Sequence, residues 1–112
     1  MKVAVIDYGV GNLGSVMRSL EELRVTPMLI KNPNDMSSAD SFILPGVGNF
    51  DRAMNELKAY ASFELIKNKE FLKDKFILGI CLGMHLLFEE SEEGVEKGLG
   101  LFKGKVKKFK NS

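Results

Sequence analysis

The sequence contains very little cysteine, and its positive and negative charges nearly cancel. With one cysteine among 112 residues, no disulfide can form within the chain, and a reduced, cytoplasmic setting is the simplest expectation. A net charge of +1 argues against a nucleic acid or a membrane surface as the main partner. The apolar run at residues 3–6 is too short for a signal peptide or a transmembrane span. With 45% apolar and 28% charged residues, the composition indicates one packed globular domain.

Short apolar runs alternate with amphipathic stretches along the chain. The apolar runs predict buried strands at 3–6, 28–30, 42–44 and 76–80. Apolar residues at three- and four-residue spacing predict helices at 13–23, 50–57, 63–71 and 82–88. This order predicts an α/β fold with an open, mostly parallel sheet and helices on both faces.

Three further segments carry weaker expectations. Residues 32–35, which include a proline between two asparagines, predict a loop. The acidic run at 89–93 is expected to be a solvated face. From residue 98 onward, apolar residues alternate loosely with lysines, which suggests one or two exposed antiparallel strands.

The one cysteine lies in a pattern typical of a catalytic nucleophile. Cys81 stands between Gly79 and Gly83, where a predicted strand meets the helix that begins at Leu82. A small-x-nucleophile-x-small sequence at such a junction is a nucleophile elbow, a turn too sharp for bulky neighbours. At the helix N-terminus, the dipole and the backbone N–H groups would favour a thiolate and could hold an oxyanion. The alternative is a buried, inert cysteine in a strand-to-helix turn.

A glycine-rich turn after the third predicted strand is a candidate for the second half of an oxyanion hole. Ligands of parallel sheets bind at the carboxyl ends of the strands, where both this turn and the elbow should lie. In elbow enzymes, one N–H comes from the residue after the nucleophile and one from a neighbouring strand loop. Here these would be Leu82 and a residue of the Gly46–Gly48 turn, with Val47 and Gly48 as candidates. The alternative is an ordinary turn.

The glycine loop after the first predicted strand allows a different interpretation. Residues 9–14 match G-x-G-x-x-G, the pattern of dinucleotide-binding loops. Asp7 and Tyr8 separate the strand from the first glycine, and no acidic residue follows the strand at 28–30 to hold a ribose. A tight strand-to-helix turn needs only the glycines and is the favoured interpretation.

His85 is the only histidine, and it follows the cysteine by four residues. Residues four apart are neighbours on a helix. An elbow cysteine points away from its own helix, however, so His85 is poorly aimed at the sulfur of Cys81. We therefore expect His85 to face a substrate or to pack, rather than to act as a general base.

Three segments together resemble the class I (triad) glutamine amidotransferases: 7–12 (DYGVGN), 45–50 (PGVGNF) and 79–84 (GICLGM). Within that class, they are most similar to the glutaminase subunits of imidazole glycerol phosphate synthases. The stretch 86–93, followed by 98–101, fits as well. The resemblance covers the whole chain and about the first half of the family's length. It implies that residues 1–112 form the N-terminal part of a single, flavodoxin-like amidotransferase domain that is truncated at its C-terminus.

The resemblance also implies a reaction and a set of site residues. Cys81 would attack the side-chain amide of glutamine to give a glutamyl thioester and ammonia, and water would then release glutamate. The oxyanion hole would be formed by the 46–48 turn together with Leu82. Glu93 matches a glutamine-binding position, and His85 stands where the family usually has a glutamine-contacting Gln.

A protein partner follows from the same resemblance. The loop that ends at Asn12 would lie at the interface with a (βα)8-barrel cyclase subunit, which uses the ammonia to close an imidazole ring. No cofactor, metal, nucleic acid or membrane is implied.

The family's catalytic triad also needs a histidine and an acid from a later segment, and the 112 residues contain no such motif. We therefore expect a fragment or truncated product that is inactive alone and that exposes apolar surface. Two alternatives remain within the resemblance. One is a paralogous amidotransferase that supplies another synthase, such as one that modifies surface-polysaccharide sugars. The other is a non-catalytic binding module.

Overall fold

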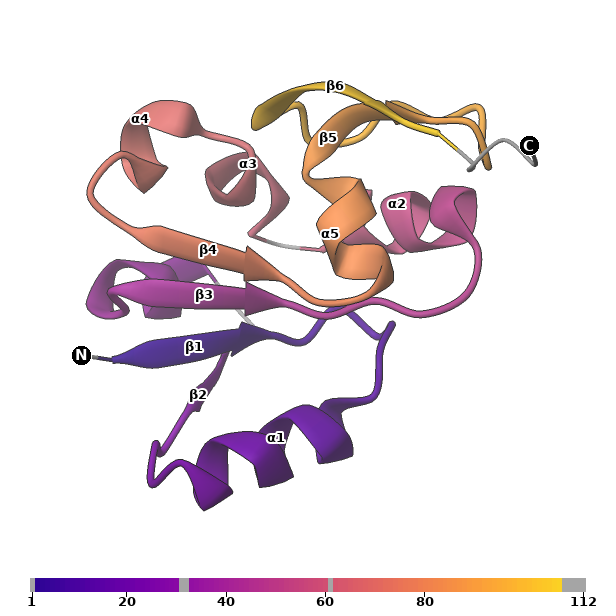
Figure 1. The fold of residues 1–112 in the computed structure, drawn as a ribbon. Coiled ribbons are helices and arrows are strands. Elements are labelled where there is room, and N and C mark those ends of the chain that lie inside the picture. The colour runs from indigo at the N-terminus through magenta and orange to yellow at the C-terminus, as the bar shows by residue number, and fades with distance from the viewer. Residues whose placement is uncertain (1, 31–32, 61, 108–112) are drawn as a thin grey trace.

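The computed structural model describes residues 2–30, 33–60 and 62–107. Its main feature is a parallel sheet of four strands, shown in Figure 1, which lie in the order β2-β1-β3-β4. These strands are β1 (Val3–Ile6), β2 (Met28–Ile30), β3 (Ser41–Leu44) and β4 (Phe76–Gly79). Every neighbouring pair is parallel, which confirms the predicted α/β class. The strand order reverses between β1 and β3, and at such a point sheets of this kind bind their ligands.

Helices cover both faces of the sheet, as expected. On one face lies α1 (Leu13–Glu22), well apart from the other helices in Figure 1. The opposite face carries α2 (Phe50–Lys58), α3 (Phe63–Ile66), α4 (Lys69–Leu72) and α5 (Leu82–Leu86). The single helix predicted at 63–71 is two, because Asn68 caps a new helix by accepting the N–H of Phe71 at 3.0 Å. The predicted 32–35 loop was wrong over its described residues, which begin a 3-10 helix, η1 (Pro33–Ser38).

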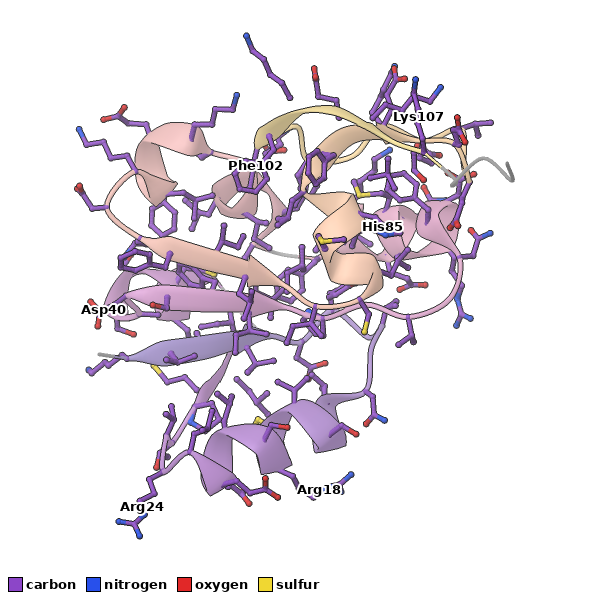
Figure 2. All side chains as sticks on the ribbon, in the orientation of Figure 1. Arg18, Arg24, Asp40, His85, Phe102 and Lys107 are labelled. Carbon is purple, nitrogen blue, oxygen red and sulfur yellow. The ribbon has the colours of Figure 1, made fainter. Side chains whose placement is uncertain are left out.

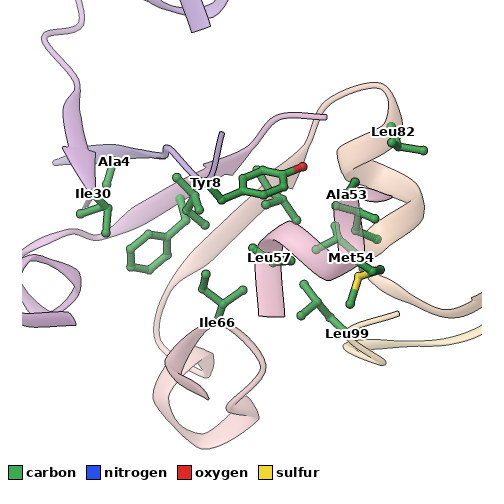
Figure 3. Packing of buried hydrophobic residues seen from close by; sticks show 14 of the residues in the cluster. Ala4, Tyr8, Ile30, Ala53, Met54, Leu57, Ile66, Leu82 and Leu99 are labelled. Carbon is green, nitrogen blue, oxygen red and sulfur yellow. The ribbon is translucent and has the colours of Figure 1, made fainter. Parts of the chain in front are cut away.

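The main core lies between the sheet and α2, α3 and α5. Alternate residues of β1 and β3 face this side, because successive side chains of a strand point to opposite faces. Figure 3 shows the side chains that interlock here, among them Met54 and Leu57 of α2 and Ile66 of α3. The largest fully buried members include Phe42, Phe50 and Leu86. The core therefore fixes α2 and α5 on the sheet, at the end where the predicted site lies.

The α1 face is incompletely covered. Phe76 and Leu78 of the edge strand β4 are 68% and 58% exposed, and Leu23 after α1 is 73% exposed. These side chains belong to an open apolar surface that continues over Ile43 and Leu20. The expectation that the chain exposes apolar surface is confirmed.

The segment after α5 differs from the prediction in two ways. The helix expected to reach residue 88 ends at Leu86. The acidic run begins in a strand, β5 (Phe88–Ser91), and Glu89, Glu92 and Glu93 are exposed, as expected for a solvated face. This strand pairs with β6 (Phe102–Val106) in parallel, so the antiparallel expectation was wrong. The reason is the path of the connecting loop, which returns to the start of β5 before β6 begins. There the N–H of Gly98 donates to Glu89 O at 2.8 Å and that of Leu101 to Leu87 O at 2.9 Å.

No helix within the described ranges is long and apolar enough to cross a membrane.

Candidate active site

The elbow has the geometry that the sequence predicts. Cys81 lies between β4 and α5 with φ 55° and ψ −125°. These angles match the first central position of a type II′ turn, which normally takes glycine. The N–H of Gly83 donates to Ile80 O at 2.9 Å and closes the turn. The cysteine is exposed, so the alternative of a buried, inert thiol is not what the structure shows.

Both glycines of the elbow are required by close backbone contacts. A Cβ on Gly83 would lie 1.9 Å from Leu44 O, and one on Gly79 would lie 2.5 Å from the Cα of Met84. Such separations are far inside van der Waals contact. The elbow is therefore packed directly on the end of β3 and on its own helix, which holds the cysteine in its strained conformation.

The turn at 45–48 lies against the elbow. The N–H of Leu82, an expected oxyanion-hole donor, donates to Gly46 O at 3.2 Å. The next N–H groups are also paired, since those of Gly83 and Met84 donate to Ile80 O and Cys81 O. An anion at the Leu82 N–H would therefore have to replace the Gly46 carbonyl.

Tyr8 fixes this turn, and the sequence analysis did not identify it. Its hydroxyl donates to Pro45 O at 2.6 Å in the protein interior. Burial raises the pKa of Tyr8 well above its usual value, so the phenol stays a neutral donor. A Cβ on Gly46 would lie 3.0 Å from the Tyr8 hydroxyl oxygen, so the glycine permits this contact. The position of Tyr8 directly after a buried strand was the available signal.

The two glycine loops meet at the point where the strand order reverses. Residues 9–11 and 47–49 line one cavity of about 320 Å³, together with Arg52 and Ala53 of α2. Gly9, Gly11 and Gly48 all have positive φ, which glycine adopts without strain. The exposed side chain of Val47 and the backbone of Gly48 therefore lie beside the first loop as well as near the elbow.

Asparagines begin the helices that follow both loops. The side chain of Asn12 accepts the N–H of Ser15 at 3.1 Å and caps α1. Asn49 accepts the N–H of Arg52 at 3.0 Å and caps α2. Each cap satisfies an otherwise free backbone donor, so helix capping alone explains why asparagine stands at both positions. The interface role expected for Asn12 stays a prediction.

The two expected glutamine-binding residues lie on different elements. His85 projects from α5 toward the side where α2 lies, as Figure 2 shows. Its Nδ1 is buried and makes no hydrogen bond to any described group, so this nitrogen does not hold the thiol of Cys81. Glu93 is exposed in the loop after β5, where its N–H donates to Ser91 Oγ at 3.1 Å. Their binding roles stay predictions.

Within the described part of the chain, no group of three or more His, Cys, Asp and Glu side chains could hold a metal ion.

An exposed cysteine with a strained backbone stands at the strand-to-helix turn of a parallel α/β sheet, which places the protein in the nucleophile-elbow class of α/β folds. A family model described as "Glutamine amidotransferase class-I" matches residues 4–112. The chain belongs to the class-I glutamine amidotransferase family. A solved structure described as "Crystal structure of glutamine amidotransferase" has the same fold, with a TM-score of 0.77 at 17% sequence identity. The match covers 96% of this chain and 56% of that one.

Curated relatives show which members of this family the chain is similar to. "Imidazole glycerol phosphate synthase subunit HisH" from a strain of Prochlorococcus marinus is 48% identical over 112 residues, which are 100% of this chain and 52% of that protein. The protein of the same name from Bacillus subtilis (strain 168) is 48% identical over 109 residues, covering 96% of this chain and 51% of its own length. The chain thus spans about half the length of the curated relatives it matches.

Proposed function

We propose that this chain is the nucleophile-bearing part of the glutaminase subunit of imidazole glycerol phosphate synthase, which acts in histidine biosynthesis. It would hydrolyse glutamine to glutamate and ammonia in the cytoplasm. The ammonia would pass to a (βα)8-barrel cyclase bound as the second subunit of a heterodimer. Identity of 48% over the whole chain to HisH proteins supports this specific assignment within the family.

The observation that carries the proposal is the backbone of Cys81. A non-glycine residue at φ 55° and ψ −125° costs about 1–3 kcal/mol, and such strain persists where the surroundings enforce it. Here Gly79 and Gly83 let the neighbouring backbone close around the turn. The result is an exposed cysteine at the tip of an elbow, and elbow enzymes hold their acyl-transfer nucleophile at this position.

The chemistry assigned to the site follows from this placement. The sulfur of Cys81 attacks the side-chain carbon of glutamine, and the carbonyl oxygen takes up negative charge. The Leu82 N–H and a donor of the 47–48 turn would stabilise that charge once the Gly46 carbonyl no longer occupies Leu82. As the intermediate collapses, the proton from the thiol is transferred to the leaving nitrogen and ammonia departs. Water then cleaves the thioester, which releases glutamate and restores the thiol. Glu93 and His85 would contact the substrate.

A general base is also needed, because a thiol is activated by a neighbouring base or by a lowered pKa. The geometry of His85 Nδ1 does not supply one at Cys81. We propose that the general base and its acidic partner lie in the half of the relatives' sequences that has no counterpart in this chain. Glutamate release is then expected only when that half is present.

Affinity labelling tests the proposal on this chain directly. A chloroketone analogue of L-glutamine is expected to alkylate Cys81 with saturation kinetics, and L-glutamine but not D-glutamine is expected to slow the reaction. Cys81→Ser is the control, and intact-mass and peptide mass spectrometry locate the label. Labelling that never saturates and proceeds at the rate of plain chloroacetone would contradict a glutamine site.

Two alternatives give different results in further assays. A binding module without catalysis would capture the cyclase while Cys81 shows no glutamine-dependent labelling. A paralogous amidotransferase would label normally, but its complete gene would not complement a histidine auxotroph that lacks this subunit.

A further inference from the structure

One acidic residue joins the two segments that the proposed site depends on. Asp51 is the second residue of α2, which begins directly after the turn at 46–48. Its carboxylate accepts the N–H of Val95 at 2.9 and 3.1 Å and the N–H of Glu96 at 2.8 Å. Val95 and Glu96 lie 44 and 45 residues further along the chain, in the loop that carries Glu93. Asp51 thus ties this loop to the start of α2.

A second contact from the same helix reinforces the attachment. The ammonium of Lys58 lies 2.6 Å from the carboxylate of Glu96. Asp51 and Lys58 are seven residues apart, which is two helical turns, so both project from one face of α2. The loop backbone is also shaped for a close approach, because a Cβ on Gly94 would lie 2.3 Å from Asp51 Oδ1.

The other end of the loop is held independently. Ser91, which is buried, accepts the N–H of Glu93 on its hydroxyl at 3.1 Å and that of Gly94 on its carbonyl at 3.3 Å. Glu93 therefore lies between two anchors, one at the end of β5 and one on α2. Removing the α2 anchor would release the loop at Val95 and Glu96, two and three residues after Glu93.

We propose that Asp51 is a positioning residue for glutamine, which fixes the loop bearing Glu93 relative to the oxyanion-hole turn. The inference rests on the proposed function. The Asp51 carboxylate accepts hydrogen bonds from two backbone N–H groups of the loop, so it would set where Glu93 stands without touching the reacting atoms. It should therefore govern how tightly the substrate binds, and not how fast bound substrate reacts.

The test compares Asp51→Asn and Asp51→Ala with the unaltered chain in chloroketone labelling of Cys81. Hydrogen bonds to a carboxylate are among the stronger ones, and asparagine keeps one acceptor oxygen while alanine keeps none. The half-saturating chloroketone concentration is expected to rise about 3-fold for Asn and about 10-fold for Ala. The maximal labelling rate and the rate with iodoacetamide, which needs no substrate site, are expected to change less than about 2-fold.

Two further variants separate positioning from general damage. Glu56→Gln removes the same charge from an exposed position of α2 and should leave the half-saturating concentration unchanged. Gly94→Ala disturbs the contact from the loop side, without altering α2, and should raise that concentration as Asp51→Ala does. Faster amide exchange at Val95 and Glu96 in the Asp51 variants would show the loop released.

The outcomes distinguish this inference from the function on which it rests. If the unaltered chain saturates with the chloroketone but both Asp51 variants keep its half-saturating concentration, the positioning role is wrong and the glutamine site stands. If iodoacetamide reactivity falls in parallel with chloroketone labelling, Asp51 supports the fold in general and the positioning role is again wrong. If the unaltered chain shows no saturation, the proposed function and the positioning role both fail.

Discussion

Replacing the strained cysteine by glycine should make the protein more stable. Cys81 holds φ 55° and ψ −125°, which costs a non-glycine residue about 1–3 kcal/mol. Glycine reaches these angles freely but loses about 0.5–1 kcal/mol more backbone entropy on folding than alanine does. The Cys81 side chain is exposed, so its removal sacrifices little packing. The expected net gain for Cys81→Gly is therefore about 1 kcal/mol, because these two ranges combine to roughly 0–2.5 kcal/mol.

Cys81→Ala is the matched control because it removes the thiol and keeps the Cβ that causes the strain. It is expected to stay within about 0.5 kcal/mol of the unaltered chain. Urea unfolding followed by circular dichroism measures both, with the slope checked for constancy. For a domain of this size, about 1 kcal/mol corresponds to roughly 4–8 °C in Tm, so thermal scans should agree.

The reasoning is refuted if Cys81→Gly is no more stable than Cys81→Ala. That result would mean that the elbow does not impose strain on its central residue. The close approaches at Gly79 and Gly83 would then serve packing alone, and the main structural support for a nucleophile at this position would be lost.

Three other perturbations have defined outcomes. Gly83→Ala should lower the free energy of unfolding by about 3 kcal/mol or more, because it forces a methyl group against Leu44 O. Its control is Gly14→Ala on α1, where a methyl group makes only ordinary contacts and should raise the free energy of unfolding by up to about 1 kcal/mol. Tyr8→Phe should cost about 1–3 kcal/mol because it leaves a buried carbonyl without its donor. Stability should fall between about pH 10 and 12, since burial and nearby carboxylates raise the pKa of Tyr60 to about 12 in the folded state, while the unfolded phenol ionises near 10.

Denaturant unfolding checks the first two, and a normal stability of Gly83→Ala or Tyr8→Phe would contradict the contacts described. For the third, a tyrosinate absorbance titration is combined with circular dichroism. The folded state binds the phenolic proton more tightly, so this stabilisation is complete below pH 10 and is lost as the pH rises through about 12. Tyr60→Phe should flatten the decline, and tyrosinate that forms near pH 10 without unfolding would disprove the burial argument.

The features predicted correctly are those with a local physical cause. Continuous apolar runs identified all four strands of the main sheet, because parallel strands with helices on both faces are apolar on both sides. The run in β4 has this composition although Phe76 and Leu78 are exposed. The elbow was identified because Gly79, Cys81 and Gly83 lie within five residues, so their constraint is visible in the sequence. The family resemblance rested on the same short segments, and the match over residues 4–112 confirms it.

The errors fall where distant contacts override local preference. Residues 88–91 follow a helix and are largely acidic, yet they form β5 because the returning loop donates backbone hydrogen bonds to Phe88 and Glu89 and β6 then pairs alongside. The parallel pairing of β5 with β6 depends on the same path of the loop, and the spacing of apolar residues in the sequence does not predict that path. The break before α4 had a local signal in Asn68, whose capping role was not recognised.

The sequence by itself determined the order of the elements, the parallel sheet and the position of the elbow cysteine, because each depends on neighbours within a few residues. Tertiary structure alone decided which groups surround that cysteine. Tyr8 reaches Pro45 across 37 residues and Asp51 reaches Val95 across 44, and only folding makes such pairs neighbours. Tertiary structure also decided that the Leu82 N–H donates to the Gly46 carbonyl, because that hydrogen bond joins two loops that folding brings together at the ends of β3 and β4.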